Sequence, residues 1–153
     1  MEKAMNHNRN CSGCPEQVSY NCKEHPAYIR KDLLSHYPDF SAVSHWHEDL
    51  EFILVLSGHM SYNVNGCSTN LETGNGILVN SRQLHHGYST DHTECEFICI
   101  LLHPLLLCAS EYYGKQYVEP LISSAALYSA VWKYCLAKRD TSDSETYLRL
   151  PGA

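Results

Sequence analysis

Two histidines and a glutamate lie close together in the central part of the chain. His45 and His47 are separated by one residue, and Glu51 follows four residues after the second histidine. In a β-strand, side chains of the same parity project from the same face. Imidazole nitrogens and carboxylate oxygens bind divalent metal ions and also hydrogen-bond to small polar ligands. The spacing predicts that these three groups face one cavity, with Ile53 and Val55 deeper inside.

A fourth candidate ligand follows a second short apolar stretch. Residues 74–85 read Gly-Asn-Gly-Ile-Leu-Val-Asn-Ser-Arg-Gln-Leu-His, which is typical of a glycine turn, a short strand and a polar turn before a histidine. We expect this segment to return His85 across a barrel to the other three groups. The four side chains then suit one divalent ion of zinc, iron, manganese or nickel, because ligand type alone does not choose among these metals. The alternative is a set of polar residues at a barrel rim, hydrogen-bonded to backbone or water.

Short strands with turn residues between them continue beyond these motifs. Residues 60–64 alternate apolar and polar side chains, and Asn65-Gly66 follows at once, which is a strong signal for a two-residue hairpin. Further strands are predicted at 77–80, 85–89 and 94–102. Evenly spaced short strands of this kind indicate a jelly roll or a small barrel.

The two motifs together resemble the paired signature of the cupin superfamily. The stretch His45–Gly58 matches its first part, His-x-His-x3-Glu-x6-Gly, although Asp39 stands where that pattern has glycine. In the second part, Ser81 and Arg82 stand where the turn has proline and glycine. The resemblance covers residues 40–124 and implies a mainly β fold, a cupin-type jelly-roll barrel (double-stranded β-helix) with short C-terminal helices.

Within the superfamily, the chain is most similar to the N-terminal, arabinose-binding-like sensor domain of AraC-type transcription regulators. The resemblance implies a ligand-binding and dimerisation module with His45, His47, Glu51 and His85 around a small polar metabolite. The expected partner is a second copy in a homodimer. The alternative is a free-standing metal-dependent cupin enzyme of the oxygenase or isomerase type, and the resemblance favours the binding module.

Three parts of the chain are expected. Residues 1–26 form a polar leader, 27–124 the barrel domain, and 125–153 a C-terminal helix and tail. Leu127, Val131, Tyr134 and Cys135 recur at helical spacing, which predicts a helix over residues 125–138.

Four residues near the N-terminus have the spacing of zinc ligands. They are Cys11, Cys14, Cys22 and His25. They could close a tetrahedral zinc site, or the cysteines could lie close together by chance in a flexible leader.

Charge and composition limit the function classes. The net charge is −6, with 11 Lys and Arg against 17 Asp and Glu, which argues against direct nucleic-acid binding by this chain. We expect no helix-turn-helix unit after residue 124. No apolar run is long enough for a membrane span, and residues 1–10 have no apolar core of the kind that an export signal needs. We therefore expect a cytoplasmic protein whose eight cysteines are free thiols.

Overall fold

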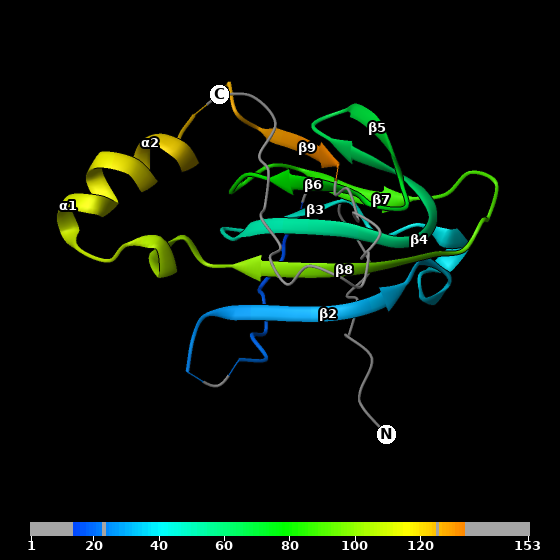
Figure 1. Cartoon of the computed structure of the whole chain (residues 1–153), viewed down its shortest axis with the longest axis horizontal. Coiled ribbons are helices and arrows are strands. Elements are labelled where there is room, and N and C mark those ends of the chain that lie inside the picture. The colour runs from blue at the N-terminus through cyan, green and yellow to red at the C-terminus, as the bar shows by residue number, and fades with distance from the viewer. Residues whose placement is uncertain (1–13, 23, 125, 134–153) are drawn as a thin grey trace, which may run out of the picture.

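The computed structural model describes residues 14–22, 24–124 and 126–133. Within them lie nine strands: β1 (Cys14–Pro15), β2 (Ala27–Leu33), β3 (His45–Trp46), β4 (Leu50–Val64), β5 (Cys67–Glu72), β6 (Asn75–Val79), β7 (His85–Tyr88), β8 (Cys95–Leu102) and β9 (Ser129–Lys133) (Figure 1). The helical elements are three 3-10 turns, η1 (Leu34–His36), η2 (Pro38–Phe40) and η3 (Pro104–Leu107), the π-helical turn η4 (Gly114–Val118), and the α-helical turns α1 (Glu111–Tyr113) and α2 (Glu119–Ile122).

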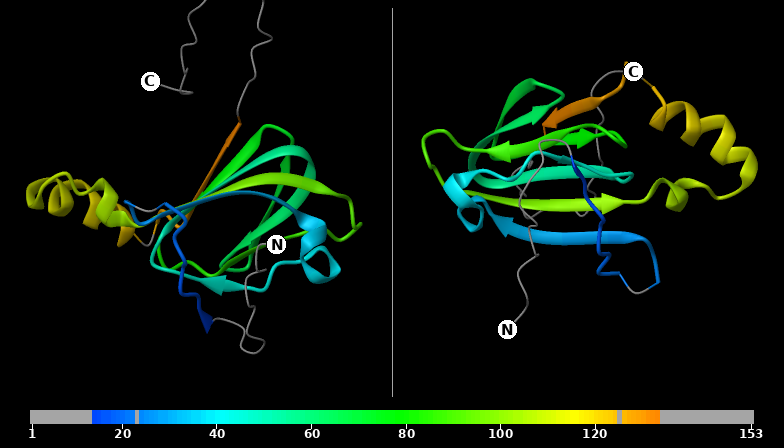
Figure 2. Two further views of the ribbon diagram at one scale, coloured as in Figure 1. Left: turned by 90° about the horizontal axis from the view of Figure 1, so that it is seen from below. Right: turned by 180° about the vertical axis from the view of Figure 1, so that it is seen from behind.

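The long strand β4 belongs to both faces of the barrel. Its first part pairs antiparallel with β6 and β8, and its second part pairs antiparallel with β5 and β7. The register with β8 shifts between Val55 and Ser57, and such a bulge bends a strand and increases its twist. One face consists of β1, β3, β7, β4 and β5, and the opposite face of β2, β8, β4, β6 and β9 (Figure 2). The predicted mainly β jelly-roll barrel is confirmed.

Apolar side chains fill the space between the two faces. Ile53 and Val55, on the same face of β4 as Glu51, are 2% and 1% exposed, as their parity predicted. Burial of each such aliphatic side chain stabilises the fold by about 1.5–3 kcal/mol. The remaining members of this core are Leu34, Met60, Tyr62, Val64, Leu71, Ile77, Val79, Cys95 and Phe97.

The predicted Asn65-Gly66 hairpin is confirmed. Both residues have positive φ, 51° and 86°, as a type I′ turn requires. Val64 pairs with Cys67, and the register continues to Met60. This turn sets which residues of β4 point into the barrel, because a shift by one residue would reverse every side chain.

Two positions that depart from the cupin pattern keep the backbone conformation that glycine favours. Asp39 has φ 52° and Arg82 has φ 62°, in the left-handed region where a Cβ costs about 1–2 kcal/mol. The glycine that ends the first motif is retained, and Gly58 has φ 75°. A Cβ on Gly58 would lie 1.9 Å from the carbonyl oxygen of Glu94.

The helix predicted over residues 125–138 is wrong in its described part, because Ser129–Lys133 is strand β9. This strand pairs antiparallel with β6 and satisfies backbone groups at an edge that a helix would leave unpaired. Trp132 lies over Gly76, where a Cβ would be 2.3 Å from the indole ring, and its ring centroid is 6.2 Å from that of Phe52. The rest of the predicted helix lies outside the described residues.

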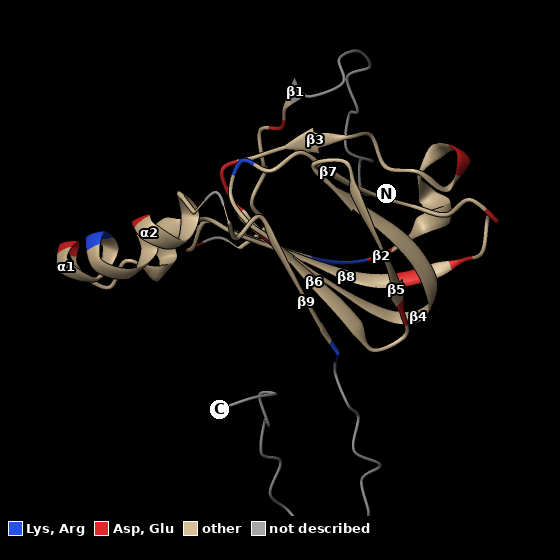
Figure 3. Ribbon diagram, turned by 90° about the horizontal axis from the view of Figure 1, so that it is seen from above, with Lys and Arg blue, Asp and Glu red and all other residues tan. Residues whose placement is uncertain are grey.

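The predicted short helices before residue 124 are present. Pro104 begins η3, and α1, η4 and α2 follow one another beyond the end of β8, projecting from one end of the barrel (Figure 1). In the described part of the chain no helix has the length and apolar character needed to cross a membrane. Figure 3 shows Lys and Arg only at scattered positions along the described ribbon.

The four candidate zinc ligands near the N-terminus are described only in part. Cys11 lies outside the described residues. Cys22 is half-buried and its Sγ contacts Asn21 Oδ1 at 3.8 Å. The zinc site there stays a prediction.

Candidate metal centre

The structure brings together the four side chains that the motifs single out. Each of the four residues offers one ligand atom, a ring nitrogen or a carboxylate oxygen, and these four atoms all lie within 4.8 Å of one another. The residues are His45, His47, Glu51 and His85. The pairing of β3 with β7 sets His45 opposite His85, and Glu51 comes from the first part of β4. The side chains of His47, Glu51 and His85 are 1–5% exposed, whereas that of His45 is 24% exposed.

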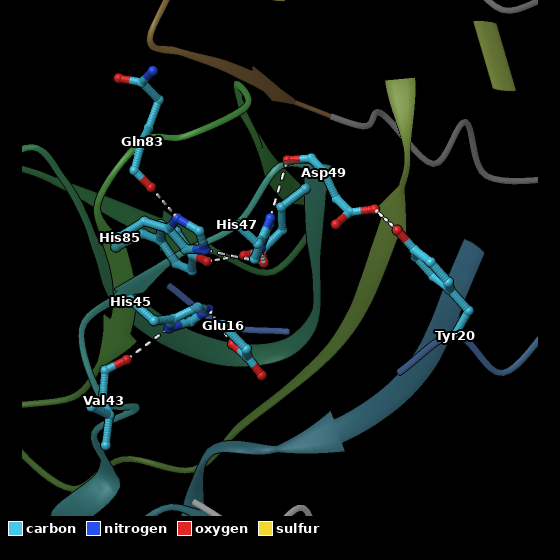
Figure 4. A network of polar contacts seen from close by, with 10 residues as sticks. Glu16, Tyr20, Val43, His45, His47, Asp49, Gln83 and His85 are labelled. Atoms are coloured by element: carbon cyan, nitrogen blue, oxygen red, sulfur yellow. Dashed lines mark hydrogen bonds and ion pairs between the residues drawn. The ribbon is translucent and has the colours of Figure 1, made fainter. Parts of the chain in front are cut away.

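In all three imidazoles, Nδ1 contacts a backbone carbonyl oxygen (Figure 4). The distances are 2.7 Å from His45 to Val43, 3.1 Å from His47 to Asp49, and 2.7 Å from His85 to Gln83. A carbonyl oxygen only accepts, so each Nδ1 carries a hydrogen and donates it. In the neutral rings, each Nε2 therefore presents a lone pair.

These lone pairs meet a carboxylate. Glu51 Oε2 lies 3.2 Å from His47 Nε2 and 3.3 Å from His85 Nε2. The other oxygen, Oε1, accepts a short hydrogen bond from the Tyr62 hydroxyl. A carboxylate has no hydrogen to donate, so neutral imidazoles would place lone pairs against lone pairs. The cluster therefore requires a cation at its centre, either a proton or a metal ion.

The pKa shifts of the clustered groups also indicate that a positive charge is favoured beside Glu51. Burial alone would raise the pKa of the Glu51 carboxyl, but the nearby His85 and His47 lower it well below its usual value. Burial would lower the pKa of His85, but Glu51 outweighs this and raises it. Burial together with the charge of His85 lowers the pKa of His45. With a proton as the cation, the charged pair is His85 and Glu51.

The donor set fits a divalent metal ion. Metal–nitrogen and metal–oxygen bonds of about 2.0–2.2 Å place two ligand atoms of one ion about 3–4.4 Å apart, so the observed spread needs only a small contraction. The carbonyl partners fix the ring orientations, which is the usual support for metal-bound histidines. A bound ion would supply a positive charge to which a small ligand can bind or by which it can be polarised.

Two residues at this centre were not assigned to it by the sequence. They are Tyr62, which lies outside both motifs, and Glu16, which lies in the N-terminal segment predicted to be a polar leader. Tyr62 lies on the same strand as Glu51, and the bend of β4 brings their side chains together. Glu16 Oε2 lies 3.1 Å from His45 Nε2. Neither contact has a signal in sequence spacing.

Comparisons with known proteins agree with the barrel architecture. Residues 36–101 match the family model described as "Cupin domain". This chain is 30% identical over 83 residues to YdeC of Bacillus subtilis (strain 168), described as an uncharacterized HTH-type transcriptional regulator. The alignment covers 54% of this chain and 28% of that protein, so the chain matches less than a third of this relative's length.

Solved structures similar to this barrel have low sequence identity to it. A Cupin 2 conserved barrel domain protein from Salinispora arenicola CNS-205 is 12% identical, with 56% of this chain and 70% of that chain covered and a TM-score of 0.46. A predicted oxalate decarboxylase from Thermotoga maritima is 23% identical, with 50% and 67% covered and a TM-score of 0.45.

Proposed function

We propose that this cupin domain binds a divalent metal ion and a small polar metabolite, as the sensing part of an AraC-type transcription regulator. The observation that carries the binding proposal is that the Nε2 lone pairs of His47 and His85 face the Glu51 carboxylate, with His45 gathered in the same cluster. The regulatory role is supported by the 30% identity to a protein described as an HTH-type transcriptional regulator.

The burial of the centre suits a binding role. His47 and His85 are almost fully buried, and access is from the side of His45, which is half-buried. A small ligand in this position would meet the metal ion and be shielded from water, which strengthens polar contacts. The outer faces of the barrel and the projecting helices are then available for a homodimer. Contacts to DNA would come from another part of the regulator, because the chain has a net charge of −6.

Metal binding is tested with the chain purified without chelators. Elemental analysis is expected to find near-stoichiometric zinc, iron, manganese or nickel. Saturating metal is expected to raise the melting temperature of the chelator-treated protein by about 5 °C or more. His47→Ala should abolish both effects. The matched control is His59→Ala, since His59 is exposed and contacts only Asp91 among its recorded side-chain partners.

Absence of metal from the purified protein, together with no response of the melting temperature to added Zn(II), Mn(II), Fe(II) or Ni(II), would overturn the proposed binding function. Equal responses of the His47→Ala and His59→Ala variants would overturn the assignment of the site. Light scattering measures the molar mass in solution and so tests the proposed homodimer. A monomer at all concentrations would contradict it.

The second candidate is a metal-dependent enzyme, favoured by the mixed nitrogen and oxygen ligand set, which suits redox-active as well as inert metals. The two functions differ in what happens to the bound molecule. Metabolites that stabilise the metal-loaded protein in a thermal-shift screen are incubated with it in air and analysed by mass spectrometry. A sensor returns the ligand unchanged, whereas an enzyme converts it over many turnovers.

A further inference from the structure

A carboxylate from the N-terminal segment reaches the metal centre at its exposed edge. Glu16 Oε2 lies 3.1 Å from His45 Nε2, and the two side chains are 28% and 24% exposed. We propose that Glu16 is an additional ligand of the metal ion, and that a small monocarboxylate metabolite binds by taking its place. This inference rests on the proposed metal-binding function and names the class of ligand for it.

The position of Glu16 is set by the backbone that carries it. β1 pairs parallel with β3, with Cys14 opposite His45, and the amide of Glu16 donates to the carbonyl of Trp46 at 2.8 Å. The paired strands thus place the Glu16 side chain next to the ligand-bearing edge of the barrel. Figure 4 shows Glu16 beside His45 in this arrangement.

Further along the same segment, two more contacts hold it to the barrel. The Tyr20 hydroxyl donates to Asp49 Oδ1 at 2.8 Å, and the backbone carbonyl of Asp49 is the group that accepts from His47 Nδ1. The Asn21 side chain exchanges hydrogen bonds with the backbone of Ile29, at 2.7 and 3.0 Å. The segment is therefore held to the barrel at Glu16, Tyr20 and Asn21, and the approach of Glu16 to His45 is part of a built contact.

The chemistry of the contact requires a shared cation. His45 donates its Nδ1 hydrogen to the carbonyl of Val43, so in the neutral ring its Nε2 presents a lone pair to the Glu16 carboxylate. Two lone-pair-bearing atoms at this distance repel unless a positive charge lies between or beside them. A metal ion held by His45 supplies that charge, and Glu16 reaches it from the His45 side.

Charge balance selects the competing ligand. A divalent ion with three neutral imidazoles and the Glu51 carboxylate leaves one positive charge in a largely buried site, where a net charge is costly. The Glu16 carboxylate cancels it. A molecule that displaces Glu16 at no cost in charge must also bring one negative charge and oxygen donors. A monocarboxylate has these properties, whereas a neutral sugar would leave the positive charge uncompensated.

The test uses Co(II) as a spectroscopic metal and acetate as the probe. Glu16→Gln is expected to change the Co(II) absorption spectrum, because one charged ligand is lost, and to weaken Co(II) binding by about tenfold. The same variant should bind acetate more tightly than the unmodified protein, because acetate no longer competes with Glu16. The matched control is Glu24→Gln, which alters an exposed carboxylate that precedes β2. Glu16→Asp keeps the charge on a shorter side chain and should lie between the two.

The outcomes separate this inference from the proposed function. If Co(II) fails to bind the unmodified protein, the metal site itself is wrong. If Co(II) binds and His47→Ala abolishes binding, the site stands. In that case, Glu16→Gln and Glu16→Asp variants with the spectrum, Co(II) affinity and acetate affinity of Glu24→Gln would overturn the role of Glu16 alone. Acetate that leaves the Co(II) spectrum of Glu16→Gln unchanged at millimolar concentration would overturn the monocarboxylate class.

Discussion

Two of the buried carboxylates in the described barrel, those of Glu51 and Asp32, differ in the hydrogens that their partners supply. Glu51 is 4% exposed and Asp32 is 5% exposed, and each has histidine and tyrosine neighbours. Asp32 accepts from the amide of Leu33 at 2.9 Å and from the Tyr37 hydroxyl at 3.0 Å, and it also contacts Arg30 Nε at 3.2 Å. Its partners bring their own hydrogens and a permanent positive charge. The histidine nitrogens around Glu51 bring neither in their neutral form.

The difference separates an acid whose charge the chain itself balances from an acid for which we propose a bound metal ion. The Asp32 cluster is complete, because donors and charge are supplied by the chain itself, and it ties β2 to the turn that follows it. The Glu51 cluster is complete only when a cation is added. Burial and the number of partners are similar in the two clusters, so the direction of the hydrogen bonds is the property that predicts which one binds metal.

The largest contrast is expected from amide substitutions in the two clusters. Asp32→Asn puts an amide group against donors and leaves Arg30 without its carboxylate, so the free energy of unfolding should fall by about 3 kcal/mol. Glu51→Gln should leave the chelator-treated protein as stable as before or more stable, because the new amide can donate to the Nε2 atoms of His47 and His85. Urea unfolding measured with chelator present gives both values.

Metal titration of the same two variants completes the contrast. Asp32→Asn is expected to retain the metal affinity of the unmodified protein as long as it is folded, and Glu51→Gln to lose it. Equal losses of stability in the two variants, or metal binding that survives Glu51→Gln, would mean that hydrogen-bond direction does not separate the clusters.

Much of the metal centre is predictable from local sequence. The spacing of His45, His47 and Glu51 predicts their convergence, although residues 47–49 lie between β3 and β4 and the three do not share one continuous strand. The polar turn before His85 brings that residue back to them. The hairpin at residues 65–66 depends on two residues that tolerate positive φ. Each of these inferences uses only neighbouring residues and a known periodicity.

What the sequence could not give depends on contacts between distant segments. The Tyr62 hydroxyl reaches Glu51 only because β4 bends at its bulge, and the position of Glu16 depends on a two-residue parallel pairing of β1 with β3. The apolar spacing around residues 127–131 suits a helix equally well. The unpaired edge of β6, which no local pattern records, selects strand β9 instead.

A smaller effect is expected from the hydroxyl that holds Glu51 in place. Tyr62→Phe removes the donor to Oε1, so the carboxylate is no longer fixed with Oε2 toward the histidines. Loss of such a supporting contact typically weakens metal binding by about 10-fold or more. Isothermal titration with Zn(II) measures the change. Tyr88→Phe is the control, because that hydroxyl contacts Ser68 on the same face of the barrel at 3.1 Å. Identical affinities for the two variants would remove Tyr62 from the metal centre.

The smallest expected effect is a pH dependence of stability that arises from the Glu51 cluster and not from the Asp32 cluster. Burial and Glu51 oppose each other in setting the pKa of His85. Their sum raises this pKa above the unfolded value of about 6.5. The stabilisation from protonated His85 is therefore complete below about pH 6.5 and is lost as the pH rises through the folded pKa. The melting temperature of chelator-treated protein should fall over that window. The melting temperature of the metal-loaded protein should not fall over this window, because metal binding favours the neutral imidazoles. The decline should persist in Asp32→Asn and disappear in Glu51→Gln, and a decline that persists in both would place its origin outside the Glu51 cluster.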